Sequence, residues 1–326
     1  MNTYKLLILI LLAGLLLTTC QPSHTPTPIP TTLPTTEVTS TVPPTPSPED
    51  VIYLSIVWHQ HQPLYYKDPE TGIYAKPWVR VHATKDYYDM AAMLEEYPDI
   101  HVTFNLTPSL IKQLQDFVDG TKDYYWVLAE KPAAELTDEE RLDVLRYFFD
   151  ANWDNQVGVF PRYQALLDKR GTDTNAGALA AAAERFTEQD FRDLQVWFNL
   201  SWFDPDFLNQ EPLKGLVERG EGFTEADKQV IFDETCRILA EILPLHARLQ
   251  KDGQIEVTMT PYAHPILPLL YATTLAQVGA PGVTLPERFF YPQDSVAQVQ
   301  RGVERYQEIF GQEPRGTWPA EGAVAQ

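Results

Sequence analysis

Three short motifs of this 326-residue chain bring together side chains that could bind and cleave a sugar. They occupy residues 58–63, 261–265 and 316–322, and they are rich in histidine, tryptophan and proline. Imidazole groups can pair with sugar hydroxyls, and an indole ring offers a flat apolar face to sugar C–H groups. The third motif adds a carboxylate, Glu321, that could attack an anomeric carbon. We therefore predict a carbohydrate-cleaving site.

Six side chains of these motifs make up the predicted site. Glu321 is the predicted nucleophile, and the predicted substrate contacts are His61, His59, His264, Trp318 and Trp58. A structural interpretation stands beside this one. The second motif could be a simple turn before a helix, and a single glutamate in a loop is most often a solvated surface residue.

The spacing of His59 and His61 would also suit a metal, because two histidines on one strand can ligate zinc. A metal site would need Asp or Cys partners at the other predicted strand ends, where the sequence offers Glu321 alone. We favour sugar binding over metal binding and expect no metal and no other cofactor.

The motifs lie at the ends of predicted strands. Apolar, β-rich runs predict strands over residues 51–59, 100–106, 255–259 and 315–318. The side chains at their ends are His59 and His61, then Asn105, then Tyr262 and His264, and finally Glu321. In β/α barrels the chemistry sits at the C-terminal ends of the strands, so we expect these side chains at one edge. Glu256, inside the third strand, is a weaker catalytic candidate.

Residues 109–250 read as a large helical insertion between the second and third strands. Thr137 and Thr187 each begin a capping-box signature before an apolar helical pattern. Thr224 opens a further helix, which Pro244 should disturb because proline lacks the backbone N–H.

A last amphipathic helix is expected to begin at Asp294 and to end at Gly311. Strands that alternate with helices predict an α/β fold, either with a parallel sheet or as a β/α barrel.

The N-terminus is typical of an exported bacterial lipoprotein. Lys5 precedes an apolar run over residues 6–17, which is too short to span a bilayer comfortably. Cys20 ends a lipobox-like sequence, so we expect its lipidation and attachment to the cell surface, with ordinary secretion as the alternative. The Pro- and Thr-rich stretch that follows should be an extended tether. The chain thus divides into a signal peptide (1–20), a linker (21–50) and a folded part (51–326).

Composition narrows the possible partners. The formal net charge of −20, from 25 basic and 45 acidic residues, argues against nucleic acid. The many aromatic residues (7 Trp, 16 Tyr and 15 Phe) fit a sugar-binding surface and fit a large core equally well. The only cysteines are Cys20 and Cys236, so a lipidated Cys20 leaves no internal disulfide. We expect Cys236 to be a buried, small apolar residue.

In their order along the chain, the motifs resemble the conserved regions of glycoside hydrolase family 57. Residues 61–63 (His-Gln-Pro) are similar to its first region, and residues 253–258 are similar to its second. Residues 318–321 are similar to its third, whose glutamate is the nucleophile. The segments 198–208 and 294–316 are similar to an amylase-like branch of the family.

The resemblance implies a partial (β/α)7 barrel, an incomplete TIM-like barrel that uses retaining chemistry on α-glucans and needs no metal. It implies that Glu321 is the nucleophile and that His61 contacts the substrate. The partner would be an α-glucan polysaccharide or oligosaccharide. Family activities include amylase, pullulanase, branching enzyme and glucanotransferase, so hydrolysis and transfer both stay open.

The family's general acid is an aspartate of a fourth region, which would fall after Gln326. We therefore expect residues 1–326 to be a fragment without the general acid and the C-terminal strands, with little turnover of unactivated glucans. One alternative is a non-catalytic surface lipoprotein that binds glucans. A less favoured one is a His-ligated, metal-dependent carbohydrate hydrolase or deacetylase, which would bind zinc and lose activity with a chelator.

Overall fold

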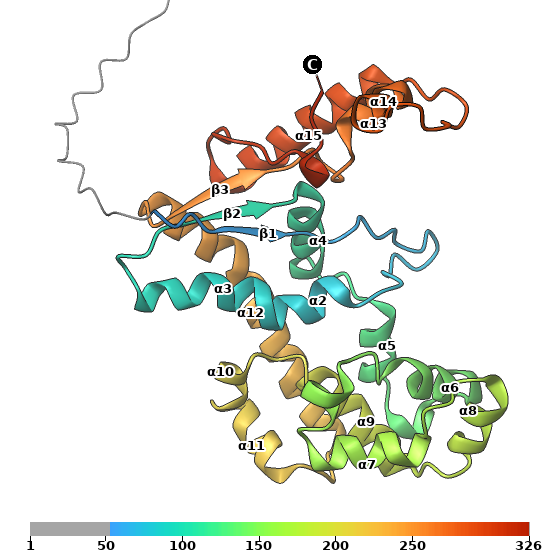
Figure 1. The fold of residues 1–326 in the computed structure, drawn as a ribbon. Coiled ribbons are helices and arrows are strands. Elements are labelled where there is room, and N and C mark those ends of the chain that lie inside the picture. The colour runs from blue at the N-terminus through green and yellow to red at the C-terminus, as the bar shows by residue number, and fades with distance from the viewer. Residues whose placement is uncertain (1–52, 326) are drawn as a thin grey trace, which may run out of the picture. The chain divides into compact units, whose positions relative to one another are not determined.

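The computed structural model describes residues 53–325 (Figure 1). The predicted signal peptide, Cys20 and the linker over residues 21–50 lie outside the described residues. None of the described helices is both long and apolar enough to cross a membrane.

Three parallel strands form the sheet, in the order β1 (Val57–Gln60), β2 (Val102–Leu106) and β3 (Ile255–Met259) (Figure 1). β1 is shorter than predicted, and it is an edge strand: Val57 and His59 are exposed, Trp58 is partly buried and Gln60 is buried. Parallel pairing aligns the C-terminal ends of all three strands at one edge of the sheet.

The predicted fourth strand forms a single parallel bridge instead, between Met259 and Thr317. The Trp318 N–H donates to the Met259 carbonyl at 2.7 Å, and the Met259 N–H donates to the Gly316 carbonyl at 3.3 Å. The next bond of this ladder would need an N–H at residue 261, which is Pro261 and has none, so the pairing cannot continue. The expected strand is therefore reduced to a short contact beside β3.

The helical run before β2 comprises α2 (Trp78–His82), a π-helical turn (Ala83–Tyr87), α3 (Tyr88–Ala92) and a 3-10 turn (Met93–Glu96). The helices between β2 and β3 are α4 (Pro108–Val118), α5 (Tyr124–Glu130), α6 (Asp138–Tyr147), α7 (Pro161–Arg170), α8 (Ala176–Ala183), α9 (Glu188–Leu200), α10 (Pro205–Leu208), α11 (Leu213–Arg219) and α12 (Glu225–Lys251). After β3 follow α13 (Leu267–Tyr271), α14 (Ala276–Gly279) and α15 (Pro292–Phe310), and the 3-10 turn η6 (Ala320–Gly322). The described residues form an α/β fold of mostly helices around a small parallel sheet; the incomplete barrel stays a prediction.

The predicted helix starts are confirmed at Thr137, Thr187 and Thr224, each of which closes a capping box with the residue three positions on. Pro244, by contrast, does not end or interrupt α12, which runs unbroken through it for 27 residues. Packing outweighs the cost of one lost backbone hydrogen bond, because the buried Leu243 and Leu245 flank the proline.

α12 joins the sheet to the helical part of the fold, because it contacts β3, α3 and α4 as well as α5 and α9 (Figure 1). Its inward face carries Phe232, Thr235 and Leu239, all buried. Cys236 follows Thr235 by one position and is exposed. The expectation of a buried Cys236 is therefore wrong, because a helix turns each successive residue about 100° away from its neighbour.

A buried ion pair and a hydrogen bond link α2 to the start of α5 and to α9. The Arg80 Nε donates to Asp123 at 2.6 Å, and its Nη1 donates to the Asn199 side chain at 2.8 Å. Asp123 also accepts the Trp126 N–H and so caps α5. Arg80, Asp123 and Asn199 are all almost fully buried, so each charge and dipole here has its partner inside the protein.

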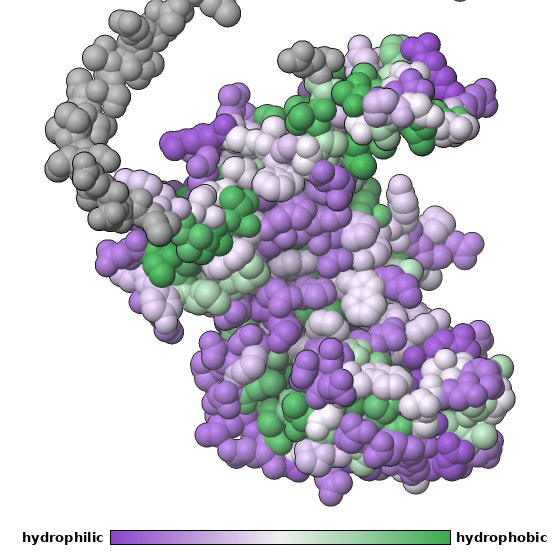
Figure 2. Space-filling view, viewed as in Figure 1, coloured by the Kyte–Doolittle hydropathy of each residue, from purple (hydrophilic) through white to green (hydrophobic). Residues whose placement is uncertain are grey.

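Most of the surface shown in Figure 2 is hydrophilic, with hydrophobic areas between. The chain leading into β1 exposes large apolar side chains, since Tyr53 is 88% and Leu54 84% exposed. They precede an edge strand that pairs with β2 only.

Candidate functional site

A row of polar side chains crosses the sheet near its C-terminal edge. The strand register aligns His59 of β1 with Asn105 of β2, and Asn105 with Thr258 of β3. The Asn105 amide nitrogen donates to Thr258 Oγ1 at 3.0 Å, so its oxygen is the atom that faces His59 Nδ1 at 2.6 Å. His59 Nδ1 therefore donates to Asn105, and Nε2 stays available to a ligand.

Three imidazole rings meet at this edge. The rings of His61 and His264 stack, with centroids 4.3 Å apart and planes 26° from parallel. The centroid of His59 lies 4.9 Å from that of His264 and 5.7 Å from that of His61. Two segments about 200 residues apart in the chain thus build one histidine cluster, defined here as His59, His61 and His264.

Two helices hold the loop that carries His264. Gln298 of α15 accepts the Tyr262 N–H at its carbonyl (2.9 Å) and the Ala263 N–H at its side-chain oxygen (2.8 Å). The Ser109 N–H, in the first turn of α4, donates to the Tyr262 carbonyl at 2.9 Å. Sequence reasoning missed Gln298 and Ser109, because no local pattern marks a residue that supports a distant loop.

Glu321 lies beside the histidine cluster in η6. Its Oε1 is 3.9 Å from His264 Nδ1, and its side chain is 68% exposed where that of His264 is 5% exposed. Both residues have positive φ, 56° at His264 and 55° at Glu321, a region that residues other than glycine seldom occupy. The carboxylate thus faces solvent next to buried imidazole.

The surroundings keep two of the imidazoles neutral. Burial, reinforced by His264 and His59, lowers the pKa of His61 to about 4, although Glu321 acts in the opposite direction. Burial and then His59 also lower the pKa of His264. A neutral imidazole offers one donor and one acceptor, which matches a sugar hydroxyl.

The two predicted tryptophans end in different places. Trp318 is 40% exposed, and its ring centroid lies 6.1 Å from that of His59, so it borders the cluster. Trp58 packs edge-on against Phe104 at 5.0 Å and contacts the core. Successive strand residues point to opposite faces, which separates Trp58 from His59. The structure thus brings His59, His61, His264, Trp318 and Glu321 together and leaves Trp58 out.

The histidine cluster has the donors for a metal as well. One ring nitrogen from each histidine can be chosen so that all three lie within 4.8 Å of one another.

Glu256, the weaker catalytic candidate, lies exposed in β3.

Comparison with solved structures finds an α-amylase and two branching enzymes. The α-amylase AmyC from Thermotoga maritima is 18% identical with a TM-score of 0.37, over 82% of this chain and 35% of that one. The GH57-type branching enzyme from Pyrococcus horikoshii is 17% identical with a TM-score of 0.38, over 82% and 34%. The GH57 branching enzyme TK1436 from Thermococcus kodakaraensis is 17% identical with a TM-score of 0.38, over 82% of this chain and 33% of that one. This chain spans about a third of the length of these structures.

No curated protein matches the sequence. A family model, described as glycosyl hydrolase family 57, matches residues 55–326, which include the strands, the histidine cluster and Glu321. This match covers most of the sequence, and the chain therefore belongs to glycosyl hydrolase family 57.

Proposed function

We propose that this chain supplies the nucleophile and the sugar contacts of a retaining site that acts on α-glucans. Glu321 attacks the anomeric carbon and forms a covalent glycosyl-enzyme, which water or another sugar hydroxyl then resolves. The observation that carries the proposal is the solvent-facing carboxylate of Glu321, 3.9 Å from the buried His264 of the histidine cluster. Family membership supports glycosidic-bond chemistry, and the matched residues include Glu321.

The remaining side chains have separable roles in this proposal. His61 and His264 are kept neutral, so each can donate to one sugar hydroxyl and accept from another. His59, aligned by Asn105, presents Nε2 to the same sugar. Trp318, partly exposed beside His59, offers a ring face to the C–H side of a sugar.

Covalent labelling tests the nucleophile by itself. A 5-fluoro-α-glucosyl fluoride carries its own leaving group, so the first step needs no general acid. We expect a single glucosyl adduct on the peptide that contains Glu321, detected by mass spectrometry, and no adduct in Glu321→Gln. Glu256→Gln is the matched control and should label like the wild type, because Glu256 is exposed within β3.

Two results would count against the nucleophile. An adduct on another residue would move the role elsewhere. Saturable binding of maltooligosaccharides without any adduct would favour the non-catalytic glucan-binding lipoprotein.

A metal-dependent hydrolase is the second candidate, because the histidine cluster offers three nitrogens within 4.8 Å of one another. Three imidazoles are a known zinc ligand set. The stacked rings of His61 and His264 favour the sugar site, since ligands of one ion converge on it rather than lie face to face. Titration with zinc and labelling in the presence of a chelator separate the two. Stoichiometric zinc lost on His264→Gln, with chelator-sensitive activity, would establish the metal enzyme.

We further propose that the protein is exported and anchored by a lipid on Cys20, with the Pro- and Thr-rich residues as a tether. The apolar run before Cys20 and the lipobox-like sequence support this. Cys20→Ala should move the protein from the membrane fraction to the soluble exported fraction. If the variant and the wild type associate with the membrane to the same extent, Cys20 carries no anchor. Ordinary secretion or a protein anchor would then explain where the protein is found.

A further inference from the structure

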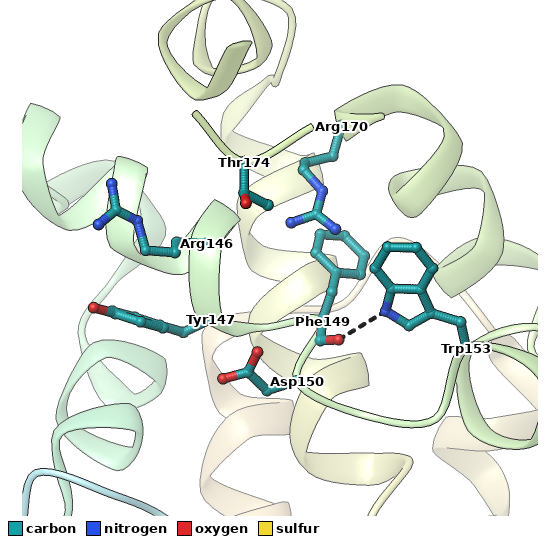
Figure 3. Close-up of a pocket in the computed structure, with 7 residues that line it drawn as sticks. All are labelled: Arg146, Tyr147, Phe149, Asp150, Trp153, Arg170 and Thr174. Carbon is teal, nitrogen blue, oxygen red and sulfur yellow. Dashed lines mark hydrogen bonds between the residues drawn. The ribbon is translucent and has the colours of Figure 1, made fainter. Parts of the chain in front are cut away.

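A pocket at α6 and α7 is lined by charged and aromatic side chains (Figure 3). These two helices lie away from the ends of the strands (Figure 1). Its volume is about 260 Å³. It lies where α6 ends, before the π-helical turn at Trp153–Val157, and at the C-terminal end of α7. The lining residues are Arg146, Tyr147, Phe149, Asp150, Trp153, Arg170 and Thr174.

Arg170 is a buried cation without a matching anion. The residue is 3% exposed, and its Nη1 donates to the Leu145 carbonyl at 2.9 Å. Its Nε has no hydrogen-bond partner, and no carboxylate in residues 53–325 lies within ion-pair distance of it. Burial accordingly lowers the pKa of this guanidinium. A buried charge of this kind is costly unless something pairs with it.

Aromatic faces offset only part of this cost. The guanidinium carbon lies 4.6 Å from the ring centroid of Phe149 and 5.7 Å from that of Trp153. Such contacts stabilise a cation by less than its desolvation costs when it is buried without an anion. The Trp153 Nε1 donates to the Phe149 carbonyl at 3.0 Å, which fixes the indole beside the pocket (Figure 3).

The charges around the pocket favour an anion with hydroxyl groups. Arg146 is exposed and adds a second positive charge at the rim. Asp150, the one acidic lining residue, accepts a hydrogen bond from the Tyr125 hydroxyl at 2.8 Å and can accept another. Two cations against one carboxylate leave a net positive pocket in a chain whose formal charge is −20. Trp153 is 40% exposed, so part of its ring is free to pack on a ligand.

The volume limits the size of that ligand. Pockets for drug-sized molecules measure roughly 300–1,000 Å³, so a pocket of about 260 Å³ suits a single sugar ring.

We propose that this pocket binds an anionic monosaccharide, a sugar phosphate or a sugar carboxylate. The anionic group pairs with Arg170 and Arg146, the ring hydroxyls pair with Asp150 and Thr174, and the C–H face packs on Trp153. This site is separate from the histidine cluster and does not depend on the function proposed for it.

Isothermal titration of the protein with glucose 6-phosphate, glucuronate, glucose and inorganic phosphate tests the proposal. We expect saturable binding of at least one anionic sugar, at least tenfold tighter than glucose and than inorganic phosphate. Binding of glucose 6-phosphate alone would identify the anionic group as a phosphate, and binding of glucuronate alone would identify it as a carboxylate. Glucose binding as tightly as both anionic sugars, or no binding at about 10 mM, would overturn the proposal.

Variants locate the site. Arg170→Met should weaken binding at least tenfold. Because a core change can disturb folding, Arg146→Met at the exposed rim provides a second test, with an expected loss of several-fold. Glu321→Gln should leave the affinity unchanged, which separates this pocket from the catalytic proposal. Unchanged affinity in both arginine variants would overturn the assignment.

Discussion

The Nδ1 atom of His264 lies 3.9 Å from Oε1 of Glu321, and both residues occupy the left-handed region of backbone conformation. Two such residues in contact are costly, at about 1–3 kcal/mol each, and persist only where the surroundings impose them. Gln298 and Ser109 hold the loop of His264, and the bridge at Thr317 holds the chain before Glu321. The contact between imidazole and carboxylate is therefore built by tertiary structure.

His264→Gln should slow covalent labelling of Glu321 on the order of 10²-fold, because small displacements of reacting groups cost about that much. The variant keeps a polar side chain but loses the ring that stacks on His61. The rate of adduct formation measures the effect. His101→Gln is the matched control, since His101 is exposed and bonds only the Gly253 carbonyl. An unchanged rate in His264→Gln would remove His264 from the site.

Acid should destabilise the protein through His246. The ring is completely buried, packs edge-on against Phe104, and has its pKa lowered to about 4 by burial. The unfolded chain takes up this proton near pH 6.5 and the folded chain does not until about pH 4. Stability from this group is therefore complete above pH 6.5 and is lost as the pH falls toward 4, by roughly 3 kcal/mol.

Urea unfolding of the wild type and of His246→Leu between pH 7 and pH 4 measures the contribution of His246 to the free energy of unfolding. The variant should lose less stability over that range, while carboxylate effects act on both proteins equally. His101→Gln should follow the wild type. Parallel curves for wild type and His246→Leu would contradict the prediction.

The sequence predicts local features of this fold more fully than tertiary ones. Capping boxes at Thr137, Thr187 and Thr224 involve residues three positions apart, so a local sequence pattern is enough to predict them. β3 matches its predicted bounds, because Gly253 and Pro261 delimit an apolar run.

Packing decides the features that the sequence does not reveal. Leu243 and Leu245 bury the helix around Pro244, and that burial is set by distant partners. The fourth strand shrinks to one bridge because pairing needs a neighbour as well as a β-rich run.

The site shows the same division. Strand-end positions predict that His59, His61, His264 and Glu321 share one edge, since parallel strands must align there. Trp58 stands one residue before His59 on a strand, and alternation turns it to the core. Gln298 carries no motif, because its role depends on where α15 docks.

Gln298→Ala should loosen the His264 loop. The variant removes the side-chain acceptor of the Ala263 N–H while keeping the backbone acceptor of the Tyr262 N–H. We expect a loss of about 1 kcal/mol in the free energy of unfolding and a slower labelling of Glu321. Gln300→Ala, an exposed glutamine on the same helix, is the control and should change neither quantity. A loss of stability without slower labelling would show that the loop keeps its position by other contacts.

Gly302→Ala should separate α15 from β3. A Cβ at Gly302 would lie 2.9 Å from the Thr260 carbonyl oxygen and 3.2 Å from the Met259 side chain. The backbone oxygen cannot move without displacing the end of β3, so we expect destabilisation of about 1–3 kcal/mol. Gly279→Ala has open space around its Cβ and an ordinary helical conformation, so it should be neutral or slightly stabilising. Because Met259 pairs with Trp318, the same displacement should slow labelling of Glu321, and unchanged stability in Gly302→Ala would mean that the helix and strand lie farther apart.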